Sequence, residues 1–566
     1  MRLTKVIIDN YRNFDYVEIN FNNHSLVFGA NDIGKTNLLK AIRLILDKSL
    51  SQTQYDADET DYCIYSAKNY IQISLEFTIY DEIEYENIIS KYGHHIKEDK
   101  FYVVYFTSKQ MNNIATFYIG YSNLIDEMTE IPRSFITSTI NCIYLDSTRD
   151  LQSYLRRAKQ RIISDYRNKR SDEEIQNDET QIALINKNIE LLNKQVEQVS
   201  YISQPTKVIT NDLKKMSFYN ETINVKLTAL TEFEDMTKNT GFISEMDGKS
   251  VEISGDGRKN QLYISMWARE NIYGEKTTSY TIFILEEPEA HLHFPMQSTT
   301  LSYILNNIKN QMIISSHSPK VVLEFKPNSI IRLYKKNNKT YIADNGCSEI
   351  IEDKILEFGY RNNLISGDMF FSDGVFLVEG PSEEIFYNEL CNQTDIDLNF
   401  FNIRVIPVNG VGFKPYVSIL KRLDIPFCIR TDNDVTFRNN KKEYSGINRL
   451  IDVYNSFGLQ TIDKFIFNEN EEPNNLNDII LNVRETLEEH GLFLSDLDLE
   501  NDLYDELSNI DFFNKEKQVS KEEFVTCLKQ KKATRMFDFM NSDIDLKRLE
   551  LSKFIYPIMY LINKLS

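Results

Sequence analysis

The chain of 566 residues is long enough for two or three domains. Its hydrophobic fraction of 42% and charged fraction of 26% are those of a soluble globular protein, and a formal net charge of -20 argues against a protein that coats nucleic acid non-specifically. Six scattered cysteines without metal spacing favour reduced thiols, and the lack of a signal-peptide core or membrane-length apolar segment predicts a cytoplasmic protein with no membrane partner.

The N-terminal elements predict a nucleotide site. Apolar runs at 3–8, 17–21 and 25–28 read as strands, and the last enters the loop Gly-Ala-Asn-Asp-Ile-Gly-Lys-Thr at 29–36. An apolar helical pattern follows, which is the context of a phosphate-binding G-x-x-x-x-G-K-T loop. Its amides surround phosphate, while Lys35 reaches the terminal phosphates of ATP and Thr36 binds the accompanying Mg²⁺. The expected nucleotide-binding residues of this loop are Gly29, Asn31, Gly34, Lys35 and Thr36.

A helical segment at about 151–216 interrupts this part of the chain. It opens with the basic residues Arg156, Arg157, Lys159, Arg161, Arg167, Lys169 and Arg170. They fit a solvated helix face and a phosphate-contacting strip equally well. An apolar heptad pattern follows at Ile182, Ile185, Ile189, Leu192, Val196 and Val199. This pattern fits either a helical hairpin that packs on itself or a homodimer interface.

Two later strands end in residues suited to nucleotide chemistry. The apolar run 280–285 precedes Glu286 and Glu287, of which one carboxylate orients the water of a metal and the other polarises the attacking water. The run 311–316 precedes His317, which we interpret as a γ-phosphate sensor. Between the loop and these strands lies a Ser-Gly-Asp-Gly turn, whose amides are candidates for phosphate binding although an ordinary turn has the same composition. Its candidate residues are Ser254, Gly255 and Gly257.

Together these motifs resemble the ABC-type ATPase head of RecF and SMC proteins, with Walker A at 29–36, a signature-like turn at 254–257 and Walker B at 282–287. The resemblance implies that two heads sandwich ATP, and hence a homodimer or higher homo-oligomer. Two departures from the usual Walker B and signature motifs of this class favour nucleotide binding with slow hydrolysis. Glu286 stands where Asp is usual, and the signature reads Ser-Gly-Asp-Gly rather than Ser-Gly-Gly-Gln. We assign residues 1–345 to this head.

Carboxylates follow successive strands in the C-terminal half. Alternating α/β units are predicted as strand 375–379, helix 382–391 beginning at Ser382, strand 403–408, helix 413–423 and strand 426–431. Glu379 ends the first strand, and Asp432 and Asp434 follow the third. Because parallel strands end at the same edge of a sheet, these side chains should converge. Their mutual repulsion calls for a divalent metal, and oxygen ligands favour Mg²⁺ or Mn²⁺.

This arrangement resembles the Toprim fold of topoisomerases, primases and nucleases. With the upstream head, it resembles the OLD (overcoming lysogenisation defect) family of nucleases over the whole chain, and in particular the nuclease subunits of Gabija anti-phage systems. The implied domains are the head, a helical linker at 346–371 and a Toprim domain at 372–566 with a helical C-terminal part. The implied metal ligands are Glu379, Glu383, Asp432, Asp434, Glu500 and Asp502. A late lysine supports the scissile phosphate; spacing does not choose between Lys531 and Lys532, and we take Lys532.

The fold class expected is therefore α/β, an ABC-type head with a helical insertion followed by a Toprim domain. The expected function is a Mg²⁺- or Mn²⁺-dependent endonuclease on double-stranded DNA that is regulated by ATP binding at the head. Nucleotide could drive cleavage or restrain it, and the altered Walker B and signature motifs favour restraint. The residues expected to act in catalysis, the last of them at the ATPase site, are Glu379, Asp432, Asp434, Lys532 and Glu287. The alternative is a RecF-like ATP-dependent DNA clamp without nuclease activity, and a topoisomerase is disfavoured because no tyrosine domain is identified. The resemblance further implies phage defence with a UvrD-like helicase as partner.

Overall fold

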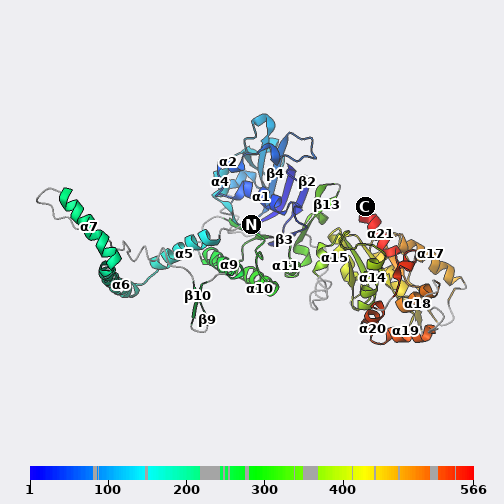
Figure 1. Cartoon of the computed structure of the whole chain (residues 1–566). Coiled ribbons are helices and arrows are strands. Elements are labelled where there is room, and N and C mark those ends of the chain that lie inside the picture. Colours follow the sequence, from blue (N-terminus) through cyan, green and yellow to red (C-terminus); the bar gives the residue numbers. More distant parts are fainter. Residues whose placement is uncertain are drawn as a thin grey trace.

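Two lobes make up the computed structural model, and a helical arm extends from the N-terminal one (Figure 1). The structure describes the chain apart from residues 81–85, 87, 89, 147–150, 217–242, 247–248, 253–254, 274–279, 337, 348–366, 411, 439–440, 469–471, 474, 510–519, 542–543 and 566. None of the helices in this described part is both long and apolar enough to cross a membrane.

An antiparallel sheet forms the first layer of the N-terminal lobe, the head. Its strand order is β2-β1-β4-β5-β6-β7. The strands are β1 (Arg2–Tyr11), β2 (Phe14–Asn20), β4 (Tyr70–Thr78), β5 (Lys100–Ser108), β6 (Thr116–Gly120) and β7 (Thr129–Glu130). Apolar side chains of β1 and β4 pack with those of helix α1 (Lys35–Leu46) and of the second sheet into one core.

The second sheet of the head places the nucleotide motifs side by side. Its order is β14-β13-β3-β12-β11-β8, and all pairs except β13 with β14 are parallel. The strands are β3 (His24–Phe28), β8 (Ile140–Leu145), β11 (Tyr280–Glu286), β12 (Met312–Ser316), β13 (Ile330–Lys336) and β14 (Lys339–Ile342). The predicted strands before the phosphate loop, the acidic pair and His317 are confirmed, and their ends meet at one edge because β3, β12 and β11 are neighbours.

The predicted helical insertion is present as α5 (Leu151–Asn168), α6 (Asp172–Gln198) and α7 (Ser200–Met216). Ser171 and Glu174 form a capping box that starts α6. Helices α6 and α7 reach away from the head (Figure 1), and no residue of α6 is buried. Among the described residues, most of the apolar heptad positions are half-buried and Leu192 is exposed, so both interpretations of this stripe stay open.

A parallel sheet with the order β16-β15-β17-β21 forms the C-terminal lobe. Its strands are β15 (Gly374–Val378), β16 (Ile403–Pro407), β17 (Phe427–Thr431) and β21 (Leu492–Leu494). Its helices are α14 (Pro381–Gln393), α15 (Lys414–Arg422), α16 (Ser445–Asn455), α17 (Leu476–Glu488), α18 (Leu499–Asn509), α19 (Lys521–Lys529), α20 (Lys532–Met540) and α21 (Tyr556–Leu565). The predicted α/β units are confirmed, except that α14 begins at Pro381 rather than at Ser382. Proline suits the first helical position, and the Glu383 carboxylate accepts the Gly380 N–H at 2.7 Å.

The two lobes share a buried junction. Arg332 of β13 donates from Nη1 to the backbone oxygen of Leu423 at 2.9 Å. In the opposite direction, Arg422 of α15 donates from Nη2 to the backbone oxygen of Gly346 at 2.8 Å. Helix α13 (Asp368–Phe371) leads into β15, whereas residues 348–366 of the predicted linker lie outside the described residues, so the domain boundaries stay a prediction.

Candidate functional site

The phosphate loop of the head has the backbone that its glycines predict. Gly34 has φ 109°, and a Cβ there would lie 2.1 Å from Nδ2 of Asn13. That amide donates to the Ile33 backbone oxygen at 3.0 Å, so the turn between β1 and β2 fixes the loop. Asn13 belongs to no sequence motif that would have identified it as a residue supporting this loop.

Lys35 is buried beneath the loop, where its Nζ donates to the backbone oxygens of Gly29 and Ala30, both at 2.9 Å. Burial lowers the pKa of Lys35, while Glu287 and Glu289 act in the opposite direction. A buried ammonium group at the centre of a loop of amides fits a phosphate group.

Glu286 joins the phosphate loop to the Walker B strand. Its carboxylate accepts hydrogen bonds from the hydroxyls of Thr36 and Tyr144. Burial, together with the hydrogen bond to Glu286, raises the pKa of Tyr144. The glutamate thus reaches the residue predicted to bind Mg²⁺, although the motif usually carries an aspartate here.

Glu287 and His317 meet at the ends of β11 and β12. The Nδ1 atom of His317 lies 3.0 Å from Oε1 of Glu287, whose backbone has φ 45°. Glu289, two residues further on, accepts from the Ser316 hydroxyl and the His317 N–H. Burial raises the pKa of Glu289, a third carboxyl that sequence reasoning did not single out.

The signature-like turn lies before α9 (Asp256–Tyr273), and Ser254 is outside the described residues. A Cβ at Gly255 would meet nothing within 4 Å, whereas one at Gly257 would lie 2.9 Å from the His291 backbone oxygen. Asn260 donates to the Ala290 backbone oxygen at 2.7 Å. The start of α9 is therefore tied to the loop after Walker B.

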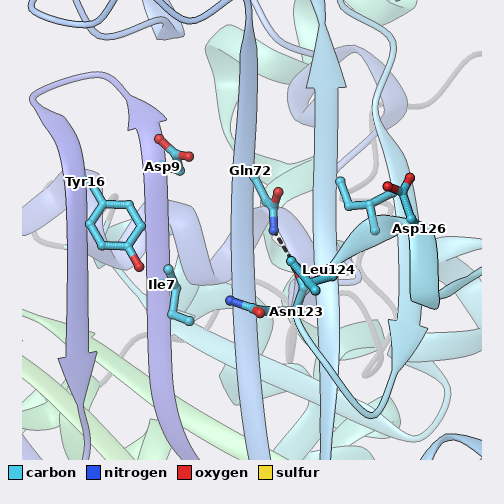
Figure 2. Close-up of a pocket in the computed structure, with 8 residues that line it drawn as sticks. Ile7, Asp9, Tyr16, Gln72, Asn123, Leu124 and Asp126 are labelled. Atoms are coloured by element: carbon cyan, nitrogen blue, oxygen red, sulfur yellow. Dashed lines mark hydrogen bonds between the residues drawn. The ribbon is translucent and has the colours of Figure 1, made fainter.

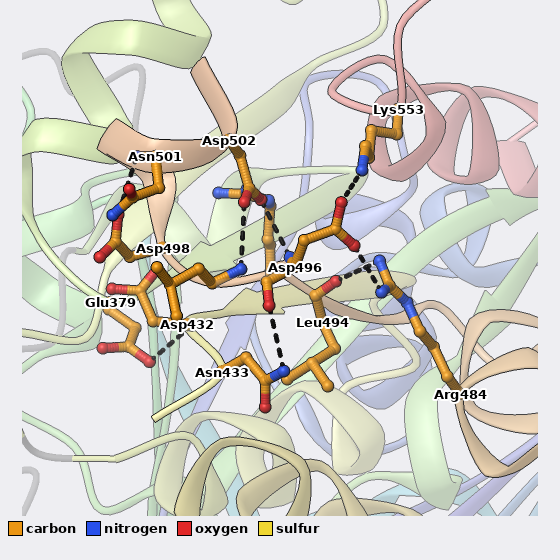
Figure 3. A network of polar contacts seen from close by, with 12 residues as sticks. Glu379, Asp432, Asn433, Arg484, Leu494, Asp496, Asp498, Asn501, Asp502 and Lys553 are labelled. Atoms are coloured by element: carbon orange, nitrogen blue, oxygen red, sulfur yellow. Dashed lines mark hydrogen bonds and ion pairs between the residues drawn. The ribbon is translucent and has the colours of Figure 1, made fainter. Parts of the chain in front are cut away.

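The C-terminal lobe brings carboxylates from three neighbouring strands to one edge (Figure 3). Glu379 follows β15, and its Oε1 accepts from the Asp432 N–H at 3.1 Å and from the Thr431 hydroxyl. Asp434 lies nearby, where both Asp434 and Glu379 contact Arg449. The convergence of these carboxylates agrees with the sequence prediction.

Asp432 is the most perturbed carboxyl of this group. Burial of the carboxyl, reinforced by Glu379 and Glu383, raises the pKa of Asp432 to about 8. Burial likewise raises the pKa of Glu383 to about 7. The Oδ1 atom of Asp432 is buried and has no hydrogen-bond partner among the described residues. An orphaned carboxylate oxygen amid other carboxylates fits a divalent cation.

Asp502 has a different environment from the one predicted for a metal ligand. Its Oδ2 accepts from Arg430 at 2.8 Å and from the Asp496 N–H at 3.1 Å, and its Oδ1 accepts from the Leu497 N–H at 3.1 Å (Figure 3). Both oxygens therefore fix the loop after β21. Glu500 is buried at the start of α18. Asp498, which sequence reasoning left unassigned, ends this loop and contributes to the raised pKa of Asp432.

Two lysines contact the acidic residues after β21: Lys553 meets Asp496 (Figure 3), and Lys529 meets Asp498. The Nζ atom of Lys529 lies 2.6 Å from Oδ2 of Asp498 at the end of α19. That hydrogen bond raises the pKa of Lys529, with Glu500 and Asp432 acting in the same direction. Lys531 and Lys532 are exposed at the start of α20 and form no ion pair with another described residue.

Two arginines also lie within this group and were missed. Arg430 is buried in β17 and pairs with Asp502, and a charged residue inside an apolar strand is a signal that could have found it. Arg449 of α16 lies with Nη2 2.6 Å from Oε1 of Glu379 and 3.1 Å from Oδ2 of Asp434. Within the described residues, no group of three or more His, Cys, Asp or Glu side chains is arranged so that it could hold a metal ion as the side chains stand.

A separate hollow lies on the antiparallel sheet of the head (Figure 2). There Gln72 donates to the Asn123 backbone oxygen at 2.9 Å, and Tyr16 and Asp9 line one side. The residues that line it include the acidic Asp9 and Asp126 but no cation. The hollow therefore offers no charge complement to a phosphate group.

Comparisons with known proteins find matches to both lobes. The sequence matches the AAA ATPase domain family over residues 1–322 and the family described as overcoming lysogenization defect protein-like, TOPRIM domain, over residues 370–434. It is 25% identical to Endonuclease GajA of Bacillus cereus over 539 residues, which cover 89% of each chain. It is 22% identical to OLD nuclease of Thermus scotoductus, with 76% of this chain and 82% of that protein covered. An SMC head bound to the C-terminal winged-helix domain of ScpA matches with 14% identity and a TM-score of 0.35, over 60% of this chain and 97% of that one.

Proposed function

This chain belongs to the AAA ATPase domain family and carries an OLD-like Toprim domain, and we propose that it is a metal-dependent DNA endonuclease regulated by ATP. The similarity to proteins named Endonuclease GajA and OLD nuclease supports this proposal over most of the chain. Double-stranded DNA is the proposed substrate, and hydrolysis of a phosphodiester bond is the proposed reaction.

The observation that carries the proposal is the buried, unpartnered Oδ1 atom of Asp432 beside Glu379 and Glu383. Burial raises the pKa of Asp432, and the neighbouring carboxylates of Glu379 and Glu383 raise it further, so a cation at this position would stabilise the charged form. Oxygen ligands favour Mg²⁺ or Mn²⁺. Glu379, Asp432, Asp434 and Glu383 are the proposed ligands, and Asp498 and Glu500 lie beside them.

Divalent ions bound at this edge would polarise the scissile phosphate and activate water for in-line attack. The residues of the chain would hold the reactants in place. Lys529, held by Asp498, carries a positive charge beside the acidic group and is the proposed partner of the scissile phosphate in place of Lys532. Arg430, which forms a buried ion pair with Asp502, offsets part of the negative charge of the carboxylate group.

ATP with Mg²⁺ is the proposed ligand of the head, bound by the loop around Lys35 with Thr36 and Glu286 at the metal. We propose that bound ATP restrains cleavage. The contact between Glu287 and His317 is positioned to respond to the terminal phosphate, and the shared junction provides a route to the Toprim lobe.

We also propose a homodimer or higher homo-oligomer in which a second copy packs on the apolar stripe of α6, because no residue of that helix is fully buried among the described residues and Leu192 is exposed. A role in phage defence with a UvrD-like helicase is proposed from the resemblance of the motifs to Gabija nuclease subunits.

Incubation of the purified protein with supercoiled plasmid, with and without Mg²⁺ or Mn²⁺, separates this proposal from the RecF-like clamp. The endonuclease produces nicked or linear DNA only when the ion is present, and the DNA carries no attached protein. A clamp retains the plasmid in an ATP-dependent way and leaves it uncut. Uncut plasmid under all ionic conditions would therefore refute the endonuclease.

A further inference from the structure

A single nitrogen atom of Arg449 faces four oxygens at the Toprim edge. Its Nη2 lies 2.6 Å from Oε1 of Glu379 and 3.1 Å from Oδ2 of Asp434. It also lies 2.9 Å from the Thr431 hydroxyl and 3.1 Å from the Asp432 backbone oxygen. Because a guanidinium NH₂ group has two hydrogens, it cannot satisfy four acceptors at once.

Four oxygens around one point suit a metal cation better than a hydrogen-bond donor, since Mg²⁺ and related ions take several oxygen ligands of this kind. Two of the four are carboxylates that the proposed function assigns to metal. We infer that Arg449 is a built-in cation that occupies a divalent-ion position, and that the ion displaces its guanidinium from Glu379 and Asp434. This inference rests on the proposed function and adds a residue that competes with the metal.

The exposure of these groups permits the exchange. The side chains of Arg449, Glu379 and Asp434 are 34%, 29% and 52% exposed, so an ion can approach from solvent. Ion pairs between side chains exposed to this degree contribute little to stability, so a divalent ion can displace the arginine.

The buried pair of Arg430 with Asp502 is the contrasting case in the same lobe. Those side chains are only 7% and 2% exposed, and breaking such a pair leaves a buried charge unpaired. Arg430 is therefore a fixed charge, whereas Arg449 is an exchangeable one. Among the residues that the structure describes, Arg430 meets no comparable set of four oxygens, and its partner Asp502 also accepts from two backbone amides.

The experiment is a titration of nucleotide-free protein with Mn²⁺, followed by the electron paramagnetic resonance signal of the free ion. Arg449→Gln removes the competitor and should bind Mn²⁺ roughly three- to tenfold more tightly than the parent. Arg449→Lys keeps the charge and should stay closer to the parent. Arg484→Gln is the matched control, because Arg484 pairs at 2.7 Å with Asp496 and with none of the proposed ligands.

The outcomes separate this inference from the function on which it rests. The Mn²⁺ that the parent binds and that Asp434→Asn fails to bind is assigned to the Toprim edge. If the parent binds such an ion and Arg449→Gln binds it equally or more weakly, the inference is overturned while the metal site stands. If the parent binds no Mn²⁺ that depends on Asp434, the metal site itself fails.

A second measurement uses only the parent and does not depend on how a variant folds. Phenylglyoxal modifies free guanidinium groups, and peptide mapping by mass spectrometry reports the modification of each arginine. Addition of Mn²⁺ should increase the modification of Arg449 and leave that of Arg484 unchanged. Unchanged or reduced modification of Arg449 in saturating Mn²⁺ would overturn the inference.

Discussion

The ring of Phe28, the last residue of β3, lies edge-on to the ring of Phe371, with centroids 5.4 Å apart and an interplanar angle of 69°. Phe28 directly precedes the phosphate loop, and Phe371 ends the helix that leads into β15 and Glu379. A cavity of about 1210 Å³ beside this pair is lined by Gly29, Asn31 and Phe371, among others. Phe28 also lies edge-on to Phe370, so the nucleotide loop and the nuclease strand are joined through aromatic contacts beside this cavity.

Replacement of Phe371 by alanine should uncouple ATP from cleavage. The parent is expected to cut less DNA as ATP is added, and Phe371→Ala should lose about half or more of that response because the contact to Phe28 is gone. Phe400→Ala, which removes an exposed ring of the same lobe, is the control. Plasmid cleavage across an ATP titration measures the ATP response of the parent and of the two variants. An unchanged ATP response in Phe371→Ala would argue against this route.

The arginines at the junction should hold the lobes together. Arg422→Met leaves the buried backbone oxygens of Ile330 and Gly346 without their donor, which costs about 2–5 kcal/mol. Calorimetry should show a lower melting temperature and a separation of the two lobes into distinct transitions. Arg404→Met, which removes a partly exposed arginine of β16, should change neither. A melt of Arg422→Met that matches the parent would contradict the role of the junction.

The two candidate lysines can be separated by mutation. Lys529→Ala should reduce plasmid cleavage by about 100-fold, because a positive charge beside the scissile phosphate is lost. Lys532→Ala should stay within about threefold of the parent, since Lys532 is exposed and makes no contact with the acidic group. The opposite ranking would restore the prediction made from the sequence.

Metal-free protein should become less stable as the pH rises. The pKa of Asp432 is raised to about 8 and that of Glu383 to about 7, so the folded state keeps protons that the unfolded chain loses near pH 4. Their contribution to the free energy of unfolding is full below about pH 4 and is lost as the pH rises through about 7 to 8. Urea unfolding in EDTA at about pH 6 and about pH 8.5 measures the difference in the free energy of unfolding between the two pH values. Asp432→Asn should reduce it, and an equal pH dependence in that variant would contradict the assignment.

Strand ends were the part of the site that sequence reasoning could predict. Apolar runs before Glu379, Asp432 and Glu286 identify buried parallel strands, and their topology places the following carboxylates at one edge. The glycines and Lys35 carried a motif of known context. Sequence alone therefore predicted the ends of β3, β11, β12, β15 and β17.

The remaining site residues depend on packing that no local pattern encodes. Strand β21 spans only Leu492–Leu494, so Asp498 carries no strand-end signal, and the family resemblance implied Glu500 and Asp502 instead. Arg449 lies on the surface of a helix whose position is set by tertiary contacts. Lys529 and Lys532 are neighbours in sequence but belong to successive helices, and only the bend between them decides which one meets Asp498.

The most direct test of the account is plasmid cleavage in Mg²⁺ or Mn²⁺ by the parent, Glu379→Ala and Glu384→Ala, without nucleotide. Glu379 accepts the Asp432 N–H and contacts Arg449 at the carboxylate edge, whereas Glu384 is a first-turn charge of α14. The account predicts that Glu379→Ala cuts no more than the parent does in EDTA and that Glu384→Ala cuts like the parent. Parental cleavage by Glu379→Ala would contradict it.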